Sequence, residues 1–333
     1  HFLSLVAIIF FMAIGFSPSV SVFWATIVAF ASSFLHVDTA LVSRDVVTGK
    51  VPRMSGLWNS GLVKALEAGS VGMLSVGATC AAAGIIVGVV TLTGLGLKFS
   101  SIVLQYADSA TRVVMSVLGA VGFEQTASLL HDVKLLLTAV MTSLIVWIVG
   151  LAVPVTASYI ICAVIAAPAL MQLGVADYAA HMFIFYYAVL SEVSPPTALS
   201  PFAAAAITGG DPYKTTLQSW KYTMPAFLVP FMFVLDPSGL GLLLMGSFKK
   251  LMAAPWADIA VVSVTAMIGI AALAAGVQNW LFRKTTQLER WLLILAGLSL
   301  VYPKAMFDYI GIALVIVAVV LQKMRREPGH AAA

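Results

Sequence analysis

The sequence predicts an all-α membrane protein: a polytopic helical bundle with a re-entrant helical hairpin and a discontinuous helix. Of its 333 residues, 61% are hydrophobic and only 10% are charged. A soluble protein keeps about a quarter of its residues charged. Since the mean hydropathy is also high, at +1.02, we expect the apolar runs to face lipid. Two proline-containing breaks in those runs predict the hairpin and the interrupted helix.

Apolar runs long enough for membrane helices, about 17–25 residues, follow one another along the chain. We predict three domains: 1–65, with two transmembrane helices and a cytoplasmic loop; 66–215, with the re-entrant hairpin (135–173) and the discontinuous helix (179–208); and 216–333, with the last helices and a basic cytoplasmic tail. The predicted elements are spans 2–16 and 18–35, a polar loop 36–64, a span 66–95, an amphiphilic stretch 98–134, an apolar region 135–173, a broken segment 179–208, spans 223–245 and 257–281, and a tight hairpin of short, tilted helices at 291–302 and 305–321.

Lysine and arginine orient these spans, because cytoplasmic loops carry an excess of them. Placing the loop 36–64 inside puts 98–134 outside, and the broken segment then runs inward. The region 135–173 gives the same topology whether it is a re-entrant hairpin or two complete spans. The basic residues that this leaves inside are Arg44, Lys50, Arg53, Lys64, Lys214, Lys221, Arg283, Lys284, Arg290, Lys323, Arg325 and Arg326. The exceptions outside are Lys98, Arg112, Lys134, Lys249, Lys250 and Lys304.

The two breaks combine proline with hydroxyl side chains. The first, GLAVPVTAS, covers 150–158, and the second, SEVSPPTALS, covers 191–200. Non-helical backbone survives at bilayer depth only where protein or a water-filled cavity satisfies it. Paired breaks are the best sequence indication of a secondary-transporter site near the middle of the membrane. The candidate site residues are Gly150, Pro154, Thr156, Ser158, Ser191, Glu192, Ser194, Pro195, Pro196 and Thr197.

Two interpretations of these breaks stay open. The prolines either open a binding site, as the pairing favours, or only kink packed helices whose freed backbone groups bond to serine and threonine. Glu192, a carboxylate well inside an apolar segment, is by default a functional residue: a coupling proton carrier or a cation ligand. Alternatively, the Glu192 side chain has no such function and only reaches a water-filled vestibule or is held by a local hydrogen bond.

The remaining polar and small residues indicate packing rather than chemistry. We expect Cys80 and Cys162 to be buried, and Gly84 and Gly88 to permit close helix packing. His36, His131 and His181 are expected to be packed or interfacial. The sequence has neither an H-E-x-x-H motif nor a P-loop, and no second carboxylate in a neighbouring span completes an acid–base pair. It therefore predicts neither an enzyme nor a nucleic-acid-binding protein.

Three segments resemble a known family. They are GIIVGVVTLTGLGLKFSSIVL (84–104), VPVTASYIICAVIAAPALMQLGV (153–175) and SEVSPPTALSPFAAAAITGGDPYKT (191–215). These resemble the fused membrane subunit of tripartite ATP-independent periplasmic (TRAP) transporters, of the group that works with TAXI-type binding proteins, over about 1–322. Where the family's hairpin tip commonly has a glycine and a threonine, this chain has Ala152 and Val155.

The resemblance implies an elevator-type transporter with inverted repeats, each holding a re-entrant hairpin and a discontinuous helix. It implies uptake of an organic anion driven by Na⁺ or H⁺, with no other cofactor, in the cytoplasmic membrane of a bacterium or archaeon. Its partners would be a periplasmic TAXI-type binding protein and a small four-helix subunit or an upstream fused region, which would hold the first repeat. The tip 150–158 and the break 191–197 would frame a cation site, with Na⁺ near Gly150, Thr156 and Ser194. The alternatives are another elevator-type anion transporter, a non-transporting scaffold and, more distantly, an intramembrane hydrolase.

Overall fold

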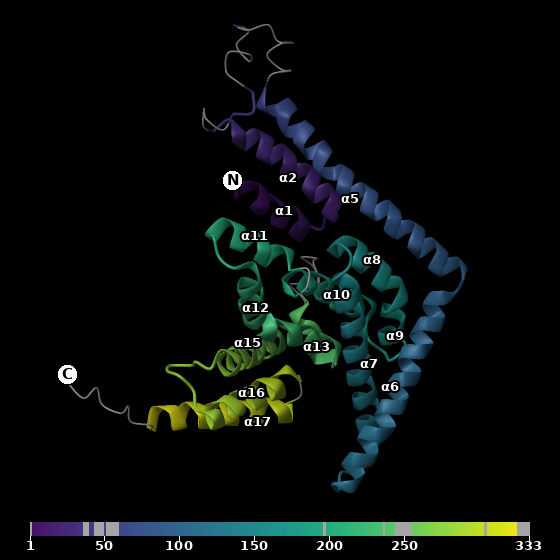
Figure 1. Ribbon diagram of the computed structural model, residues 1–333, viewed down its shortest axis with the longest axis vertical. Coiled ribbons are helices and arrows are strands. Elements are labelled where there is room, and N and C mark those ends of the chain that lie inside the picture. The colour runs from purple at the N-terminus through teal and green to yellow at the C-terminus, as the bar shows by residue number, and fades with distance from the viewer. Residues whose placement is uncertain are drawn as a thin grey trace, which may run out of the picture. The chain divides into compact units, whose positions relative to one another are not determined.

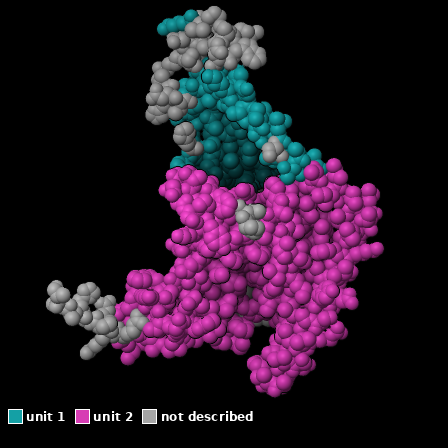
Figure 2. Space-filling model, viewed as in Figure 1, with its two compact units in different colours: residues 1–81, 244–255 teal, residues 82–243, 256–333 magenta. Residues whose placement is uncertain are grey.

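The computed structural model divides the chain into two compact units, shown in Figure 2: His1–Ala81 with Leu244–Pro255, and Ala82–Leu243 with Trp256–Ala333. It describes residues 2–35, 40–42, 50, 60–195, 198–235, 237–243, 255–302 and 305–324. The described chain is helical apart from turns and one isolated bridge between Trp280 and Lys284. Within the described ranges, four helices are long and apolar enough to cross a membrane. The prediction of an all-α polytopic membrane protein is confirmed.

The first unit holds two short helices and the start of a long one. Helix α1 (Leu3–Ile14) ends at Gly15, whose φ of 103° is a conformation that glycine adopts readily. Helix α2 (Pro18–Ser33) begins directly after Ser17, whose hydroxyl accepts a hydrogen bond from the Val20 amide. The predicted spans 2–16 and 18–35 are therefore helices. Predictions that lie outside the described residues concern His36, Arg44, Arg53, Lys249, Lys250, Lys304, Arg325 and Arg326.

Helix α5 (Gly61–Leu92) turns into α6 (Leu95–Ala120) at Gly94, which has a φ of 63°. A Cβ at Gly84 or Gly88 would meet nothing within 4 Å, so the described chain does not use these glycines for close packing. Helix α6 is amphiphilic, as predicted. It buries one face against α7, α8 and α9, and this face comprises Gly96, Ser100, Val103, Ala107, Thr111 and Met115.

The region 135–173 forms a helical hairpin of unequal arms. Helix α7 (Ala127–Gly150) is long enough to cross a membrane. After a tight turn, α8 (Val155–Ile165) runs back beside it (Figure 1) and continues, after a bend at Ala166, into α9 (Ala167–Met171). The return arm from Val155 to Met171 covers about 25 Å at 1.5 Å per residue, against about 30 Å for the hydrocarbon core. The re-entrant hairpin and the two complete spans both stay open as interpretations.

The second break interrupts a helix as predicted. Helix α10 (Asp177–Leu190) passes into a 3₁₀ turn, η2 (Ser191–Val193), and helical structure resumes at α11 (Leu199–Thr208). Helix α12 (Pro212–Thr223) follows after Asp211, whose carboxylate caps it by accepting a hydrogen bond of 2.8 Å from the Lys214 amide.

The predicted continuous span 223–245 is wrong. The structure replaces it with a 3₁₀ helix η3 (Met224–Leu228), a short helix α13 (Val229–Val234) and a second 3₁₀ helix η4 (Pro237–Leu242). Each piece carries a proline at or next to its first residue, and proline removes a backbone donor and clashes with the preceding turn. These pieces pack on the hairpin and broken-helix region through Phe231 and Met232, which belong to its buried core.

The C-terminal helices form a close-packed group: α15 (Trp256–Gln278), α16 (Gln287–Val301) and α17 (Ala305–Met324). The prediction that the last helix is short is also wrong, because α17 has 20 residues and can cross a membrane. Gln322, which lies in the last turn of α17, is fully buried. Its side-chain amide donates to the Arg283 carbonyl at 2.9 Å, and its oxygen accepts from the Phe282 amide at 3.2 Å.

We expect Gly297→Ala to lower the unfolding temperature of the protein. A Cβ at Gly297 would lie 2.3 Å from Leu273 Cγ and 2.7 Å from the Gly269 carbonyl oxygen, and such overpacking costs about 1–3 kcal/mol. Gly77→Ala is the matched control, because nothing lies within 4 Å of that site. Thermal unfolding of the purified variants in detergent measures the difference, and equal unfolding temperatures would contradict the packing.

Candidate functional site

Both breaks meet at a cluster of buried small residues. Gly150 ends α7, Ser158 lies one turn into α8, and Ser191 opens η2. A Cβ at Gly150 would lie 2.5 Å from Ser191 Oγ, 2.7 Å from Ser191 Cβ and 3.3 Å from Ser158 Oγ. Both serines are fully buried. The absence of a side chain at Gly150 therefore lets the hairpin tip and the broken helix come into direct contact.

The hydroxyls at the second break keep acceptor capacity. Ser191 Oγ donates to the Ala188 carbonyl at 2.7 Å, and Ser194 Oγ donates to the Leu190 carbonyl at 3.0 Å. Each bond uses the single proton of the hydroxyl and leaves its oxygen lone pairs for another partner. A small cation is one such partner, because hard cations prefer oxygen ligands.

Ser158 has the least satisfied side chain of the cluster. Its Oγ is buried, and no group among the described residues lies at a distance and angle that would make a hydrogen bond to it. Cys162, one turn further along α8, lies within side-chain reach, but a thiol is only a weak hydrogen-bonding group. A buried hydroxyl without a good partner destabilises the fold, so its presence at the hairpin tip suggests a ligand-related role.

Both breaks precede a helix without a side-chain cap, and the backbone at the second break is unusual. Pro154 precedes α8 as an N-cap that offers no side-chain hydrogen bond, so the amides of the first turn have no side-chain cap. Ala198, which precedes α11, has a φ of 37°, a left-handed conformation that disfavours a side chain by about 1–2 kcal/mol. Strain of this kind concentrates at functional sites. Two helix N-termini, each a positive dipole end, thus begin next to the breaks.

The structure does not gather every predicted residue. Pro154 and Thr156 are exposed, Glu192 and Pro195 are half-buried, and Ser194 is buried three residues after Ser191. Pro196 and Thr197 lie outside the described residues. The side chains next to Gly150 are those of Ser158 and Ser191, and not those of Thr156 and Ser194. A sodium site near Gly150, Thr156 and Ser194 therefore stays a prediction.

A row of polar residues along α7 was missed in the sequence. Thr138, Thr142 and Ser143 are buried on the way to the tip, and Thr142 Oγ1 has no hydrogen-bond partner among the described residues. Thr138 and Thr142 are four residues apart and therefore share one face of the helix, and this was the available signal. Beside them is a pocket of about 260 Å³, lined by Ser143, Leu144, Trp147, Tyr187, Trp220, Met224 and Phe227.

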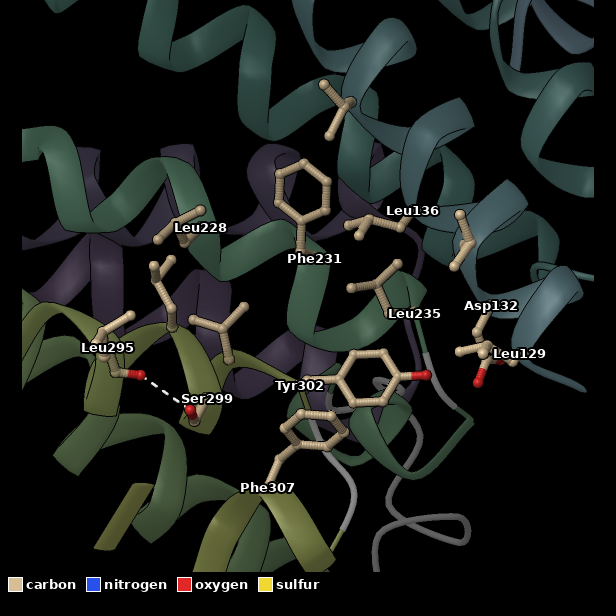
Figure 3. A pocket seen from close by; sticks show the side chains of 14 residues that line it. Leu129, Asp132, Leu136, Leu228, Phe231, Leu235, Leu295, Ser299, Tyr302 and Phe307 are labelled. Atoms are coloured by element: carbon tan, nitrogen blue, oxygen red, sulfur yellow. Dashed lines mark hydrogen bonds between the residues drawn. The ribbon is translucent and has the colours of Figure 1, made fainter. Parts of the chain in front are cut away.

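A larger cavity, of about 540 Å³, lies away from these residues between α7, α13 and α16. Its walls are mostly leucine, valine and phenylalanine, and none of the predicted site residues lines it. Tyr302 points its hydroxyl toward the side on which Leu129 and Asp132 lie (Figure 3). The cavity therefore does not extend the cluster at the hairpin tip.

The donor set at the tip suits an alkali cation better than a transition metal. Among the described residues, no group of three or more histidine, cysteine or acidic side chains could hold a metal ion. Hydroxyl and carbonyl oxygens predominate where the two breaks meet. Such ligands do not select zinc or copper.

Comparison with known families agrees with this arrangement. The family model described as "Tripartite ATP-independent periplasmic transporter, DctM component" matches residues 1–238. The chain belongs to the DctM family. The DctM match includes the hairpin α7–α8 and the broken helix α10–α11, whereas α15, α16 and α17 lie beyond it. The chain is thus a multi-pass membrane component of a TRAP-type transporter, a family of transport proteins rather than enzymes.

DctM components generally work with a periplasmic binding protein and a small membrane subunit. No curated protein and no solved structure matches the chain.

Proposed function

We propose that this DctM chain contributes one hairpin and broken-helix pair to the cation-driven uptake of an organic anion, a carboxylate. The observation that carries the proposal is the contact of Gly150 with Ser191 and Ser158. It joins the two breaks at one point, as a shared binding site requires. We propose Na⁺ as the ion that binds at this cluster, because the oxygens there belong to neutral hydroxyl and carbonyl groups and not to a charged base. H⁺ coupling is the alternative, and uptake measurements distinguish the two.

The cluster also suggests how a cation would act. Ser158 lies on the return arm of the hairpin and Ser191 on the broken helix, so an ion bound by both would hold the tip against the break. The N-termini of α8 and α11, both without a side-chain cap, offer positive dipole ends to an anion. Cation and carboxylate would therefore favour the same closed arrangement, which is the basis of coupling.

We further propose the partners and location of the complete transporter. The binding protein is of the TAXI type, the transporter moves as an elevator, and it resides in the cytoplasmic membrane of a bacterium or archaeon. A small four-helix membrane subunit or an upstream fused region is a further partner. These proposals rest on the residues that resemble the family.

Uptake into proteoliposomes tests the function. The complete transporter is reconstituted with its binding protein and offered radiolabelled acetate, pyruvate, succinate, 2-oxoglutarate and glutamate, under an imposed Na⁺ or H⁺ gradient. We expect accumulation of at least one carboxylate that requires both the binding protein and the Na⁺ gradient. Dependence on H⁺ alone would contradict Na⁺ coupling. Uptake that needs neither gradient nor binding protein would contradict the proposal, and no uptake of any of them would favour a scaffold role.

Glu192 provides a separate prediction. It lies half-buried in η2, directly after Ser191. We expect Glu192→Gln to reduce gradient-driven uptake by about tenfold or more, within the usual range of coupling effects, because the variant removes a carboxylate beside the cation cluster. Glu192→Asp is the control that keeps the charge. Uptake measured from pH 6 to pH 8 that is unchanged in rate and in ion dependence would exclude a coupling role for Glu192.

A further inference from the structure

A second polar cluster connects the hairpin to the broken helix away from the tip. Asp177 lies in the first turn of α10, and its carboxylate is 3.3 Å from Nε2 of His181, one turn later. The other ring nitrogen of His181, Nδ1, is 3.1 Å from the hydroxyl of Tyr159 on α8. The imidazole thus lies between a carboxylate of its own helix and a hydroxyl of the hairpin's return arm.

Aromatic packing fixes the geometry of this cluster. The Tyr159 ring meets the His181 ring edge-on, with centroids 6.1 Å apart and an interplanar angle of 64°. It also meets Phe185 edge-on at 5.9 Å and 88°. Because Tyr159 is held by two rings of α10, its hydroxyl stays within reach of the imidazole. A change in the bond between them must therefore act on the contact between α8 and α10.

Histidine is the side chain that changes its charge near neutral pH. A neutral imidazole donates from one nitrogen and accepts at the other, whereas an imidazolium donates from both. With Asp177 accepting at one side, the imidazolium makes a charge-assisted bond to the Tyr159 hydroxyl oxygen at the other. Charge-assisted hydrogen bonds are roughly twice as strong as neutral ones. Protonation therefore strengthens the link between the two helices.

The cluster is placed to affect the site. Tyr159 directly follows Ser158 on the short helix α8, and α10 leads to Ser191. A motion that separates the tip from the break by moving α8 against α10 also breaks the bond between Tyr159 and His181. By linkage, closure and proton uptake then favour each other.

Other titratable groups near α10 are few among the described elements packed against it. Helices α9 and α13 carry none in their sequences, and α8 carries only Tyr159 and Cys162. Glu192 is at the opposite end of α10, in η2. Helix α7 contributes Lys134, paired with Asp108 at 2.8 Å, and it brings His131 and Asp132 to a pocket of about 190 Å³ that Leu173, Gly174, Val175 and Ala176 also line, just before α10. His131 is thus the second histidine to test.

We infer that Asp177, His181 and Tyr159 form a proton-binding site that controls how the return arm α8 lies against the broken helix α10. The ligand is a proton, and the protein does not enclose the side chains of Asp177 and His181, which are 71% and 37% exposed. This inference deepens the proposed function, since it assigns a pH-dependent control of the same hairpin. It does not depend on which cation drives uptake.

A buried reporter at the hairpin tests the inference without substrate. Ala157 on α8 is 3% exposed, so a cysteine there reacts with maleimide only when the arm moves. The complete transporter carries Cys80→Ser, Cys162→Ala and Ala157→Cys in Na⁺-free nanodiscs. Each rate is divided by that of Tyr213→Cys, a variant at an exposed position, measured at the same pH, which removes the intrinsic pH dependence of thiol chemistry. We expect the normalised rate to be about three- to tenfold lower at pH 6 than at pH 8.

Three variants decide the outcome. His181→Gln and Tyr159→Phe should each abolish the pH effect, whereas His131→Gln should leave it intact. In parallel, ¹⁵N NMR of histidine-labelled protein should show, among the signals of the chain's five histidines, one imidazole signal that is lost in His181→Gln and persists in Tyr159→Phe, and the remaining signals report that each variant is folded. A pH effect that survives His181→Gln, or that is lost in His131→Gln, overturns the inference.

This test and the uptake assay fail independently. If the pH effect is found but no carboxylate is accumulated, the proposed function is wrong and the proton site stands. If uptake is found and the normalised rate is the same at pH 6 and pH 8, the proton site is wrong and the proposed function stands.

Discussion

Replacing Gly150 with valine is expected to abolish gradient-driven uptake. The first atom of any side chain at this position would lie 2.5 Å from Ser191 Oγ and 2.7 Å from Ser191 Cβ, distances at which the hairpin tip must move away from the break. Because the cation site is proposed to form from both segments, separating them removes it. Uptake should fall at least a hundredfold, since a misplacement of about 1 Å at a working site has effects of that size.

Gly84→Val is the matched control, because a Cβ there meets nothing within 4 Å. It should retain most of the uptake. Thermal unfolding of both variants separates a local displacement from a loss of fold. If Gly150→Val transports like Gly84→Val, the tip and the break do not need to touch.

A compensating pair distinguishes sterics from chemistry. In Gly150→Ala with Ser191→Gly, the added methyl occupies the space that the serine side chain leaves. We expect the pair to recover the unfolding temperature lost in Gly150→Ala alone, yet to remain inactive because the Ser191 hydroxyl is gone. Recovery of uptake by the pair would show that Ser191 serves only as packing.

The elements that followed from the sequence are those determined by local chain chemistry. The breaks at Pro154 and after Ser191 could be predicted because proline and short polar runs act on their own neighbourhood. The span 223–245 was predicted as continuous because its high hydropathy, averaged over a window, concealed Pro225, Pro230 and Pro237. The length of α17 was missed for the opposite reason: the predicted run 305–321 stops before Gln322, a polar residue whose buried side-chain amide is satisfied by distant backbone groups.

The site shows the same division between local and tertiary information. The sequence identified both breaks, but it could not decide which hydroxyls face each other. Thr156 and Ser158 are two residues apart on one helix and therefore point in directions about 160° apart. Packing against the Gly150 region buries Ser158 and leaves Thr156 exposed. The cluster of His181 was unpredictable for a related reason, because its partner Tyr159 comes from another helix.

Ser158→Ala is expected to make the protein more stable and the transporter less sensitive to Na⁺. The Ser158 hydroxyl is buried with no hydrogen-bond partner among the described residues except the weak thiol contact. Removing a buried polar group of this kind should raise the free energy of unfolding by about 1–3 kcal/mol. A residue that destabilises the fold and still has a function is typical of a binding site.

Thr142→Val distinguishes the two effects. Thr142 Oγ1 is likewise buried without a partner in the described chain, but it lies on α7 eight residues before the tip residue Gly150. Both variants should raise the unfolding temperature, whereas only Ser158→Ala should increase the Na⁺ concentration for half-maximal change in tryptophan fluorescence, by about tenfold, the loss expected for one ligand. Trp147, three residues before Gly150, supplies that signal near the tip. If Ser158→Ala behaves like Thr142→Val in both measurements, the Ser158 hydroxyl does not bind the cation, and the cluster at Gly150 is a packing contact.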